Sequence, residues 1–187
     1  MTRTIVILLI VALIAVLPAG CSPGDSSGGA VKDTAADKNA VFTQLIEPEQ
    51  LIVKEEAEEL LGAAVANVQK SEQEVVGQKQ CLYEFAGEAS DRFLQVSLTQ
   101  RAFIKNQNAE VTPKFIFESI KDNFEAELVA IDGIGEEAFI TTPGIHILQG
   151  DYYIVIAVGN TSNETNRDIL KAAGAKAVRN LEQLTNK

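Results

Sequence analysis

The chain has 187 residues, of which 46% are hydrophobic, 22% charged and 6% aromatic, enough for one domain with a substantial core. Its 26 acidic and 16 basic residues give a formal net charge of −10, which argues against nucleic-acid binding because that function needs clustered Lys and Arg. Two cysteines do not make a disulfide scaffold, and the hydrophobic fraction is too high for a disordered acidic chain.

The N-terminus has the pattern of a secretory signal. Arg3 is the only charged residue among the first four, and residues 5–17 form an apolar run without a charge. A helix of that length spans about 20 Å, less than the roughly 30 Å of a bilayer's hydrocarbon core. We therefore expect residues 1–20 to be a signal peptide.

The residues that end this run are Leu17-Pro18-Ala19-Gly20-Cys21. They resemble the bacterial lipobox, in which small residues precede a cysteine that receives a diacylglycerol and becomes the mature N-terminus. Ala19 and Gly20 match the two positions before the cysteine, whereas Pro18 stands where the family usually has Leu. The resemblance implies a bacterial lipoprotein in which Cys21 is the lipidation site. The alternatives are an uncleaved anchor and ordinary cleavage, which would leave Cys21 as a free thiol.

The lipid reading also predicts where the protein is found. More than one acyl chain, palmitate among them, is needed for lasting attachment to a membrane. A triacylated cysteine would hold the protein outside the cytoplasm. In a host with two membranes we expect the periplasmic face of the outer membrane, and otherwise the cell surface. The membrane would then be a partner through the lipid anchor alone.

A tether follows the anchor and leads to one domain. Residues 21–39 are rich in Ser and Gly and have Val31 as their only large apolar residue. Such a segment cannot bury enough surface to offset the entropy of ordering, so we expect a flexible tether. The apolar pattern becomes periodic afterwards, which predicts a single globular domain over residues 40–187.

The first half of this domain reads as a helix followed by strands. Ala57, Leu60 and Leu61 have helical spacing before Gly62, which predicts a helix over residues 54–61. Valines between 65 and 76 alternate weakly, and residues 81–85 and 93–99 alternate with period two, as in strands with one wet face. Residues 87–92 read as the turn between the last two strands.

The second half repeats this order. Thr112 and Pro113 predict the start of a helix whose apolar face extends to Phe124. Four strands are expected at residues 127–131, 138–141, 144–149 and 152–158, with turns at Pro143-Gly144 and Gly150-Asp151. Thr165 and Asp168 resemble a capping box and predict the start of a final helix.

This order of elements predicts an α+β fold in which helices cover one face of an antiparallel sheet. Residues 54–99 and 113–158 show a similar succession of helix and strands. Two similar αβ halves are therefore an open alternative to a single undivided arrangement.

No residue pattern points to a cofactor or a metal. Asp132-Gly133-Ile134-Gly135 lacks the third glycine and the following helix of a dinucleotide site, so we expect a structural turn. Cys81 is expected to be a buried, inert thiol, because catalysis would need a base. His146, the only histidine, lies on another predicted strand, which disfavours both a Cys/His pair and a zinc site.

A second resemblance involves residues 133–139, which read Gly-Ile-Gly-Glu-Glu-Ala-Phe, together with Leu61-Gly62 and Cys81-Leu82-Tyr83. These segments are similar to those of several families of small bacterial lipoproteins and extracellular sensor domains of unknown function. The resemblance covers most of residues 45–185. It implies no site, because those families have no agreed catalytic residues.

These observations favour a non-catalytic, lipid-anchored binding or interaction module with an unknown protein or small-molecule partner. Its site would be the exposed face of the sheet or the loops around Gly133 and Pro143. In one version an apolar ligand lies between helices and sheet. The alternatives are an enzyme that uses the carboxylates Glu136, Glu137 and Asp151, and a structural protein of the cell envelope.

Overall fold

The structure is a computed structural model that describes residues 44–87, 92–106 and 111–186, all within one compact unit. The expected signal peptide, Cys21 and the tether at 21–39 lie outside the described residues, as does most of the turn expected at 87–92. No helix in the described ranges combines the length and the apolar character that crossing a membrane requires.

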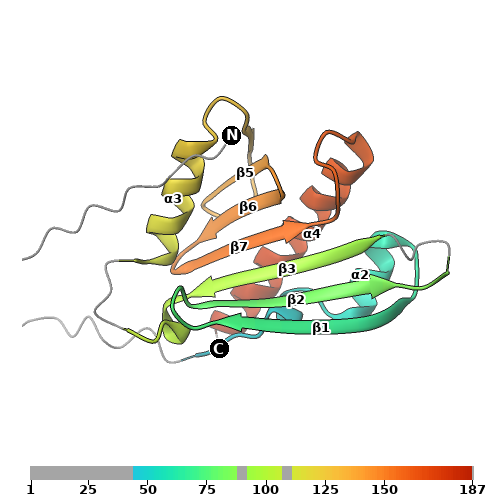
Figure 1. Cartoon of the computed structure of the whole chain (residues 1–187), viewed down its shortest axis with the longest axis horizontal. Helices are drawn as coiled ribbons and strands as arrows, with labels where there is room; N and C mark the ends of the chain where they lie inside the picture. Colours follow the sequence, from blue (N-terminus) through green and yellow to red (C-terminus); the bar gives the residue numbers. More distant parts are fainter. Residues whose placement is uncertain (1–43, 88–91, 107–110, 187) are drawn as a thin grey trace, which may run out of the picture. The chain divides into compact units, whose positions relative to one another are not determined.

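A seven-stranded sheet forms the centre of the unit, with every neighbouring pair of strands antiparallel (Figure 1). The strands are β1 (Val65–Gln73), β2 (Gln78–Phe85), β3 (Phe93–Gln100), β4 (Val129–Ile131), β5 (Glu137–Thr141), β6 (Gly144–Gln149) and β7 (Tyr152–Ala157). Their order across the sheet is β1-β2-β3-β7-β6-β5-β4. The helices are α1 (Pro48–Leu51), α2 (Lys54–Leu61), α3 (Pro113–Asn123) and α4 (Glu164–Thr185), with a short 3-10 helix η2 (Arg101–Phe103). The predicted α+β class is confirmed.

Local signals set several of these boundaries. Gly62 ends α2 with φ +65°, in the left-handed region that glycine adopts without strain. Thr112 caps α3, because its side chain accepts a hydrogen bond from the backbone N–H of Phe115 at 3.1 Å. The start of α4 differs from the prediction. Asn163 caps this helix by accepting from the N–H of Asn166 at 3.3 Å, so the expected cap at Thr165 and Asp168 is wrong.

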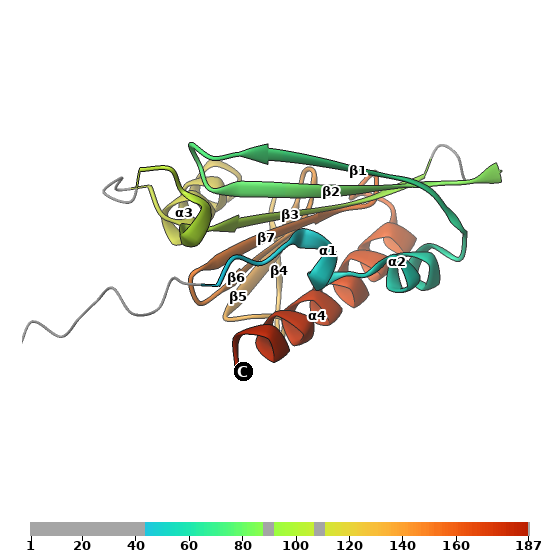
Figure 2. The same cartoon turned by 90° about the horizontal axis from the view of Figure 1, so that it is seen from below.

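The larger core lies between the sheet and the helices α1, α2 and α4, which share one face (Figure 2). Isoleucines of β6 and β7 meet Leu170, Ala173 and Ala177 of α4 there. Near its N-terminal end the unit is held by Gln100, a fully buried side chain that donates to the carbonyl of Ile46 at 2.6 Å and accepts from its N–H at 2.9 Å. Both polar groups of Ile46 are thus satisfied inside the protein.

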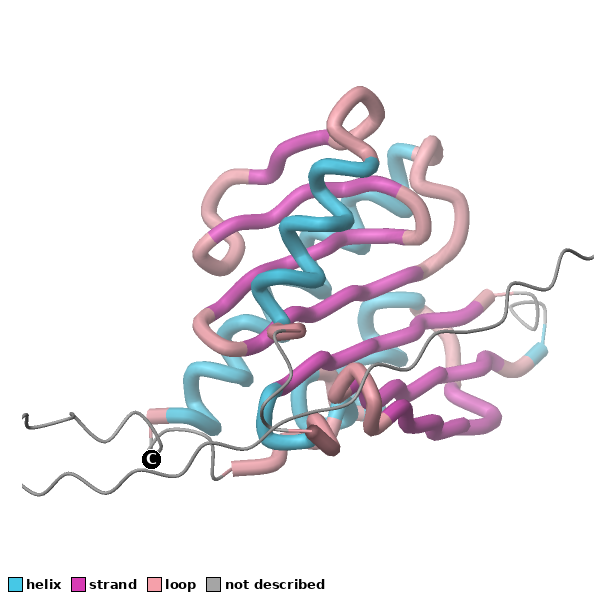
Figure 3. Tube along the Cα trace, turned by 60° about the vertical axis from the view of Figure 1, so that its left-hand side comes forward, coloured by secondary structure: helices cyan, strands magenta, loops and turns pink. Residues whose placement is uncertain are grey.

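Helix α3 lies across the opposite face of the sheet (Figure 3), and a second, smaller core lies beneath it. Phe117 of α3 packs there against Phe139, Leu148 and Tyr153. The expectation that helices cover only one face is therefore incomplete. Strands β5, β6 and β7 carry apolar side chains on both faces, and each face needs a covering layer.

The two similar successions of helix and strands do not have the same arrangement. The helix before β1, α2, packs on the same side of the sheet as α4, whereas α3, the helix before β4, packs on the other side. A two-fold axis that relates neighbouring antiparallel strands such as β3 and β7 runs perpendicular to the sheet. It would therefore place equivalent helices of the two halves on the same face of the sheet. The two halves are therefore not related by such an axis.

Candidate functional site

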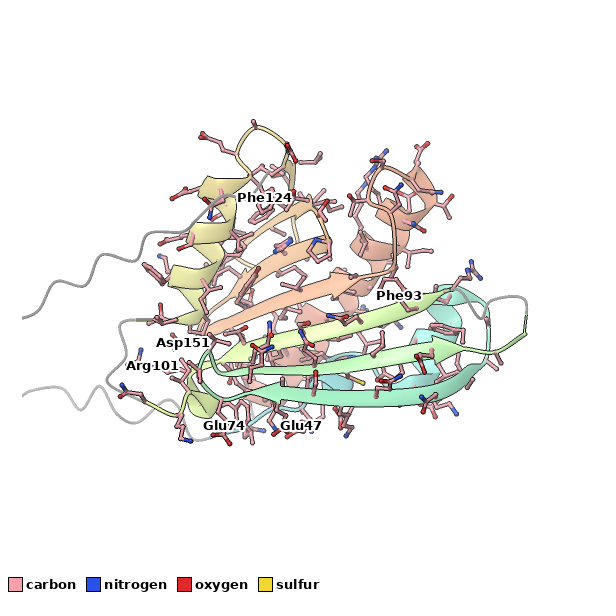
Figure 4. The ribbon with its side chains drawn as sticks, viewed as in Figure 1. Glu47, Glu74, Phe93, Arg101, Phe124 and Asp151 are labelled. Atoms are coloured by element: carbon pink, nitrogen blue, oxygen red, sulfur yellow. The ribbon has the colours of Figure 1, made fainter. Side chains whose placement is uncertain are left out.

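The most distinctive surface is the half of the sheet that α3 leaves uncovered. Because α3 packs mainly on β6 and β7, the side of β1, β2 and β3 that points away from α4 faces outward. The register places twelve side chains on this side of the three strands, and we call them the open face: Asn67, Gln69, Ser71, Gln73, Gln78, Gln80, Leu82, Glu84, Phe93, Gln95, Ser97 and Thr99. Ser97 and Thr99, at the end of β3, are buried at 3% and 2% exposure. Phe93 lies at the start of β3 (Figure 4).

Amide and hydroxyl side chains dominate the open face and hydrogen-bond to one another. Ser71 donates to the side-chain Oε1 of Gln80 at 3.0 Å, and the side-chain amide of Gln80 donates to Oε1 of Gln78 at 3.2 Å. Gln95 donates to the hydroxyl of Ser97 at 3.2 Å. Apart from the buried Ser97 and Thr99, the polar groups of the open face are exposed or half-buried, so they have further capacity for hydrogen bonds with a ligand.

Glu84 is the only ionisable side chain of the open face. Asn67 donates to one of its carboxylate oxygens at 2.7 Å and Gln69 donates to the other at 2.9 Å. These two hydrogen bonds keep the pKa of Glu84 below its usual value. The open face thus has one fixed charge in a chain whose net charge is −10.

The shape of the open face suits an extended ligand better than a small enclosed one. A shallow hollow of about 110 Å³ is lined by Gln69, Ser71, Gln80, Leu82 and Gln95, together with Lys70. The residues of this surface offer neither a nucleophile with an adjacent base nor a pair of carboxylates. The arrangement can bind a ligand through hydrogen bonds.

The turn between β4 and β5, the first of the two loops predicted as a site, surrounds a hollow of about 300 Å³. Gly133 and Gly135 have φ of +77° and +64°, and a Cβ at Gly135 would lie 2.7 Å from the carbonyl oxygen of Leu148. The Gly-x-Gly segment is therefore a structural turn, as its sequence predicts.

Two of the three carboxylates of the enzyme alternative have separate partners. Glu137 forms an ion pair with Lys121 of α3, and this contact raises the pKa of Lys121. Glu136 accepts a hydrogen bond from the N–H of Gly150 at 3.0 Å. Asp151 lies in the turn between β6 and β7 and does not line the hollow at the β4–β5 turn (Figure 4). Glu136 and Glu137 are thus fixed by different groups, and both line the hollow at the β4–β5 turn.

The loop around Pro143 joins β5 to β6 and contains a cis peptide bond between Thr142 and Pro143. A polar hollow of about 240 Å³ beside it is lined by Thr141, Thr142, Ser162 and Arg167, among others. Arg167 donates to the carbonyl oxygens of Thr161 and Ser162, both at 3.2 Å. These contacts use the guanidinium to fix the segment before α4.

Cys81 and His146 lie in different cores. Cys81 is fully buried in the core under α4, where burial raises the pKa of its thiol. The ring of His146 lies on the α3 side of the sheet, stacked on Phe139 with 4.9 Å between ring centroids. The expectation that the Cys81 thiol is buried is confirmed, and the sheet separates the two side chains.

The sequence did not reveal a polar pair in the core under α3. His146 and Tyr153 are hydrogen-bonded through Nδ1 and the hydroxyl at 2.6 Å, whereas the buried Nε2 of His146 makes no well-formed hydrogen bond with the described residues. Burial lowers the pKa of His146 to about 4. The two residues flank a Gly150-Asp151 hairpin turn, which is the one signal that could have indicated their proximity.

The region between α4 and the sheet is filled by side chains. A Cβ placed on Gly174 of α4 would lie 3.0 Å from Cδ1 of Ile147 and 3.1 Å from Cδ1 of Ile145. Leu170 and Ala173, on the same helix, are fully buried. This packing leaves no room at that contact for the apolar ligand considered above.

Within the described residues, no group of three or more His, Cys, Asp and Glu side chains is arranged to hold a metal ion. Comparisons of this chain with protein-family models, with curated proteins and with solved structures find no match.

Proposed function

We propose that the protein is a lipid-anchored, extracytoplasmic binding module whose open face binds a partner rich in neutral hydrogen-bonding groups. The observation that supports this proposal is the uncovered half of one sheet face, which carries amides and hydroxyls and a single carboxylate. Peptide backbones and glycan chains present such groups. An acidic polymer is disfavoured because the net charge of −10 would repel it.

The anchor is tested by intact-mass analysis of the natively expressed chain and by membrane fractionation. We expect the N-terminal residue to be Cys21 carrying lipid, and the protein to be in the membrane fraction. A Cys21→Ser variant should lose the lipid and leave that fraction. A chain recovered from the cytosol with residues 1–20 still attached would refute the anchor without bearing on the open face.

The open face is tested with a defined neutral probe, an oligomer of N-acetylglucosamine, which carries both amide and hydroxyl groups. In a titration followed by NMR, the side-chain amide signals of Gln69, Gln80 and Gln95 should shift. Gln183, on the exposed side of α4, is the matched control and should not shift. A short uncharged peptide is the second probe. If neither probe moves the signals of the open face more than that of Gln183, the proposed binding surface is wrong.

A variant distinguishes specific binding from a general effect of the probe. Replacing Gln80 by Leu removes the central amide, which both donates to Gln78 and accepts from Ser71. Because an exposed or half-buried polar residue contributes little to stability, we expect the fold to persist and binding to weaken about tenfold. The equivalent change at Gln183 should leave the affinity for the probe unchanged.

A further inference from the structure

The outer edge of β1 is an unpaired edge of the sheet. β1 is the terminal strand, it has nine residues, and all of them after Val65 are exposed. The opposite edge strand, β4, has three residues. No described strand pairs with the outer side of β1, so its backbone groups on that side are available to another strand.

Opposite charges lie two positions apart on this strand. Lys70 and Glu72 are on the side of β1 that faces the helices, since their cross-strand partners are Cys81 and Lys79. Lys70 forms an ion pair with Glu49, and Glu72 lies 3.0 Å from Lys79. Both side chains are still more than half exposed, at 56% and 53%, and can contact a further partner.

Symmetry restricts how two such edges can pair. A two-fold axis perpendicular to the sheet preserves each face, so residues on the same face must lie opposite one another. An axis at position 70 or 72 would place two lysines or two glutamates opposite each other. An axis at Ser71 instead places each Lys70 opposite the other copy's Glu72, which makes two Lys–Glu pairs.

The same axis gives compatible contacts on the open face. There Gln69 lies opposite Gln73 of the second copy, and Ser71 lies opposite its own equivalent. Side-chain amides and hydroxyls both donate and accept hydrogen bonds, so like can pair with like. When the two strands pair about an axis at Ser71, the side chains on both faces of the edge are therefore complementary to those of the second copy.

We infer that the outer edge of β1 binds the same edge of a second copy of this chain, antiparallel and centred on Ser71. The two sheets then form one continuous sheet across the dimer. The contact involves few residues and joins two acidic molecules, so it belongs to the weak class of interfaces. Confinement of both copies to one membrane surface by the proposed anchor would strengthen the contact. The pairing of the two edges does not itself depend on the anchor.

Disulfide trapping tests the register in cells that make the full chain. Opposite residues of antiparallel strands have Cα atoms about 4.5–5.5 Å apart, within the range that a disulfide spans. Ser71→Cys should therefore give a disulfide-linked dimer after brief oxidation. Gln69→Cys and Gln73→Cys are matched controls on the same face. Each would lie about 13 Å from its own equivalent and should not cross-link.

Charge exchange tests the chemistry of the contact in the Ser71→Cys background. Lys70→Glu places carboxylates opposite each other, and Glu72→Lys places ammonium groups opposite each other. Each change alone should reduce the cross-linked fraction about tenfold. Co-expression of the two variants restores opposite charges and should restore a mixed dimer. That recovery also shows that both variants fold.

Three outcomes would overturn the inference. Equal cross-linking at positions 69, 71 and 73 would indicate unspecific collision. A disulfide from position 71 to a different protein would assign the edge to another partner. Failure of co-expression to restore the mixed dimer would show that Lys70 and Glu72 do not face each other across the contact. None of these results depends on whether the open face binds a glycan or a peptide.

Discussion

His146 makes the stability of the folded chain sensitive to acid. Its folded-state pKa of about 4 lies below the usual 6.5, because burial between Phe139 and Tyr153 disfavours the charged imidazole. Between these pH values the unfolded chain binds more protons than the folded chain. The free energy of unfolding is therefore unaffected by this group above pH 6.5. It falls as the pH drops toward 4, by up to about 3 kcal/mol.

A double variant isolates this contribution. His146→Phe with Tyr153→Phe removes the titrating ring together with the hydroxyl that it binds, so no polar group is left without its partner. We expect the free energy of unfolding to fall by less between pH 7 and pH 4.5 in the double variant than in the unmodified chain. Urea unfolding at both pH values measures this difference. An equal fall in both proteins would show that folding does not lower the pKa of His146.

Asn163 provides a second test at single residues, because the sequence and the structure assign the cap of α4 differently. Asn163→Ala removes the acceptor for the N–H of Asn166 and should destabilise the chain by about 1 kcal/mol. Thr165→Ala, at the position predicted from the sequence, should change stability by less than about 0.5 kcal/mol. Thermal unfolding of both variants distinguishes them. A larger loss at Thr165 would contradict the observed start of the helix.

At the scale of elements, α3 offers a direct test of its packing side. Phe117 is fully buried against Phe139 and Tyr153, whereas Phe115, two residues earlier, is 56% exposed. We expect Phe117→Ala to destabilise the chain by about 3–5 kcal/mol and Phe115→Ala to have little effect. Denaturant unfolding measures both changes. Comparable losses would mean that α3 does not use the face seen in the structure.

The position of α3 also shows what the sequence leaves undetermined. Strands with one wet face, such as Cys81–Phe85, are readable from their alternation. Residues 144–148 and 152–158 are mostly apolar, which is typical of strands buried on both faces and could have indicated a helix on each side. By contrast, β3 and β7 are neighbours in the sheet although their paired residues are more than fifty positions apart in the sequence. No local pattern specifies that pairing.

Some features of the candidate site can likewise be predicted from local patterns, whereas others cannot. Alternation along β2 and β3 predicts that one face of these strands is polar, and the exposed face of the sheet is one of the binding sites predicted from the sequence. Which part of that face is uncovered depends on where α3 packs. The core around His146 depends on the register between β6 and β7. These features arise from tertiary packing and could not be derived from the spacing of residues in one segment.

At the scale of the whole molecule, the excess of acidic residues should oppose compact folding. The formal net charge is −10 at pH 7, and several of the described ion pairs join two exposed side chains, which individually add little stability. Salt screens both the net repulsion and these attractions. Because the repulsion involves every acidic residue and the pairs involve only some, we expect the repulsion to dominate.

Moderate salt should therefore stabilise the folded chain at neutral pH. Raising NaCl from about 20 mM to about 200 mM shortens the screening length from roughly 20 Å to roughly 7 Å, which should raise the thermal midpoint by a few degrees. At pH 4.6, near the isoelectric point, the net charge is small and the same addition should have little effect. Calorimetry at the two pH values separates this effect from a general action of salt. A midpoint that falls with salt at pH 7 would show that the ion pairs, among them those joining Lys79 and Lys176 to glutamates, outweigh the net repulsion.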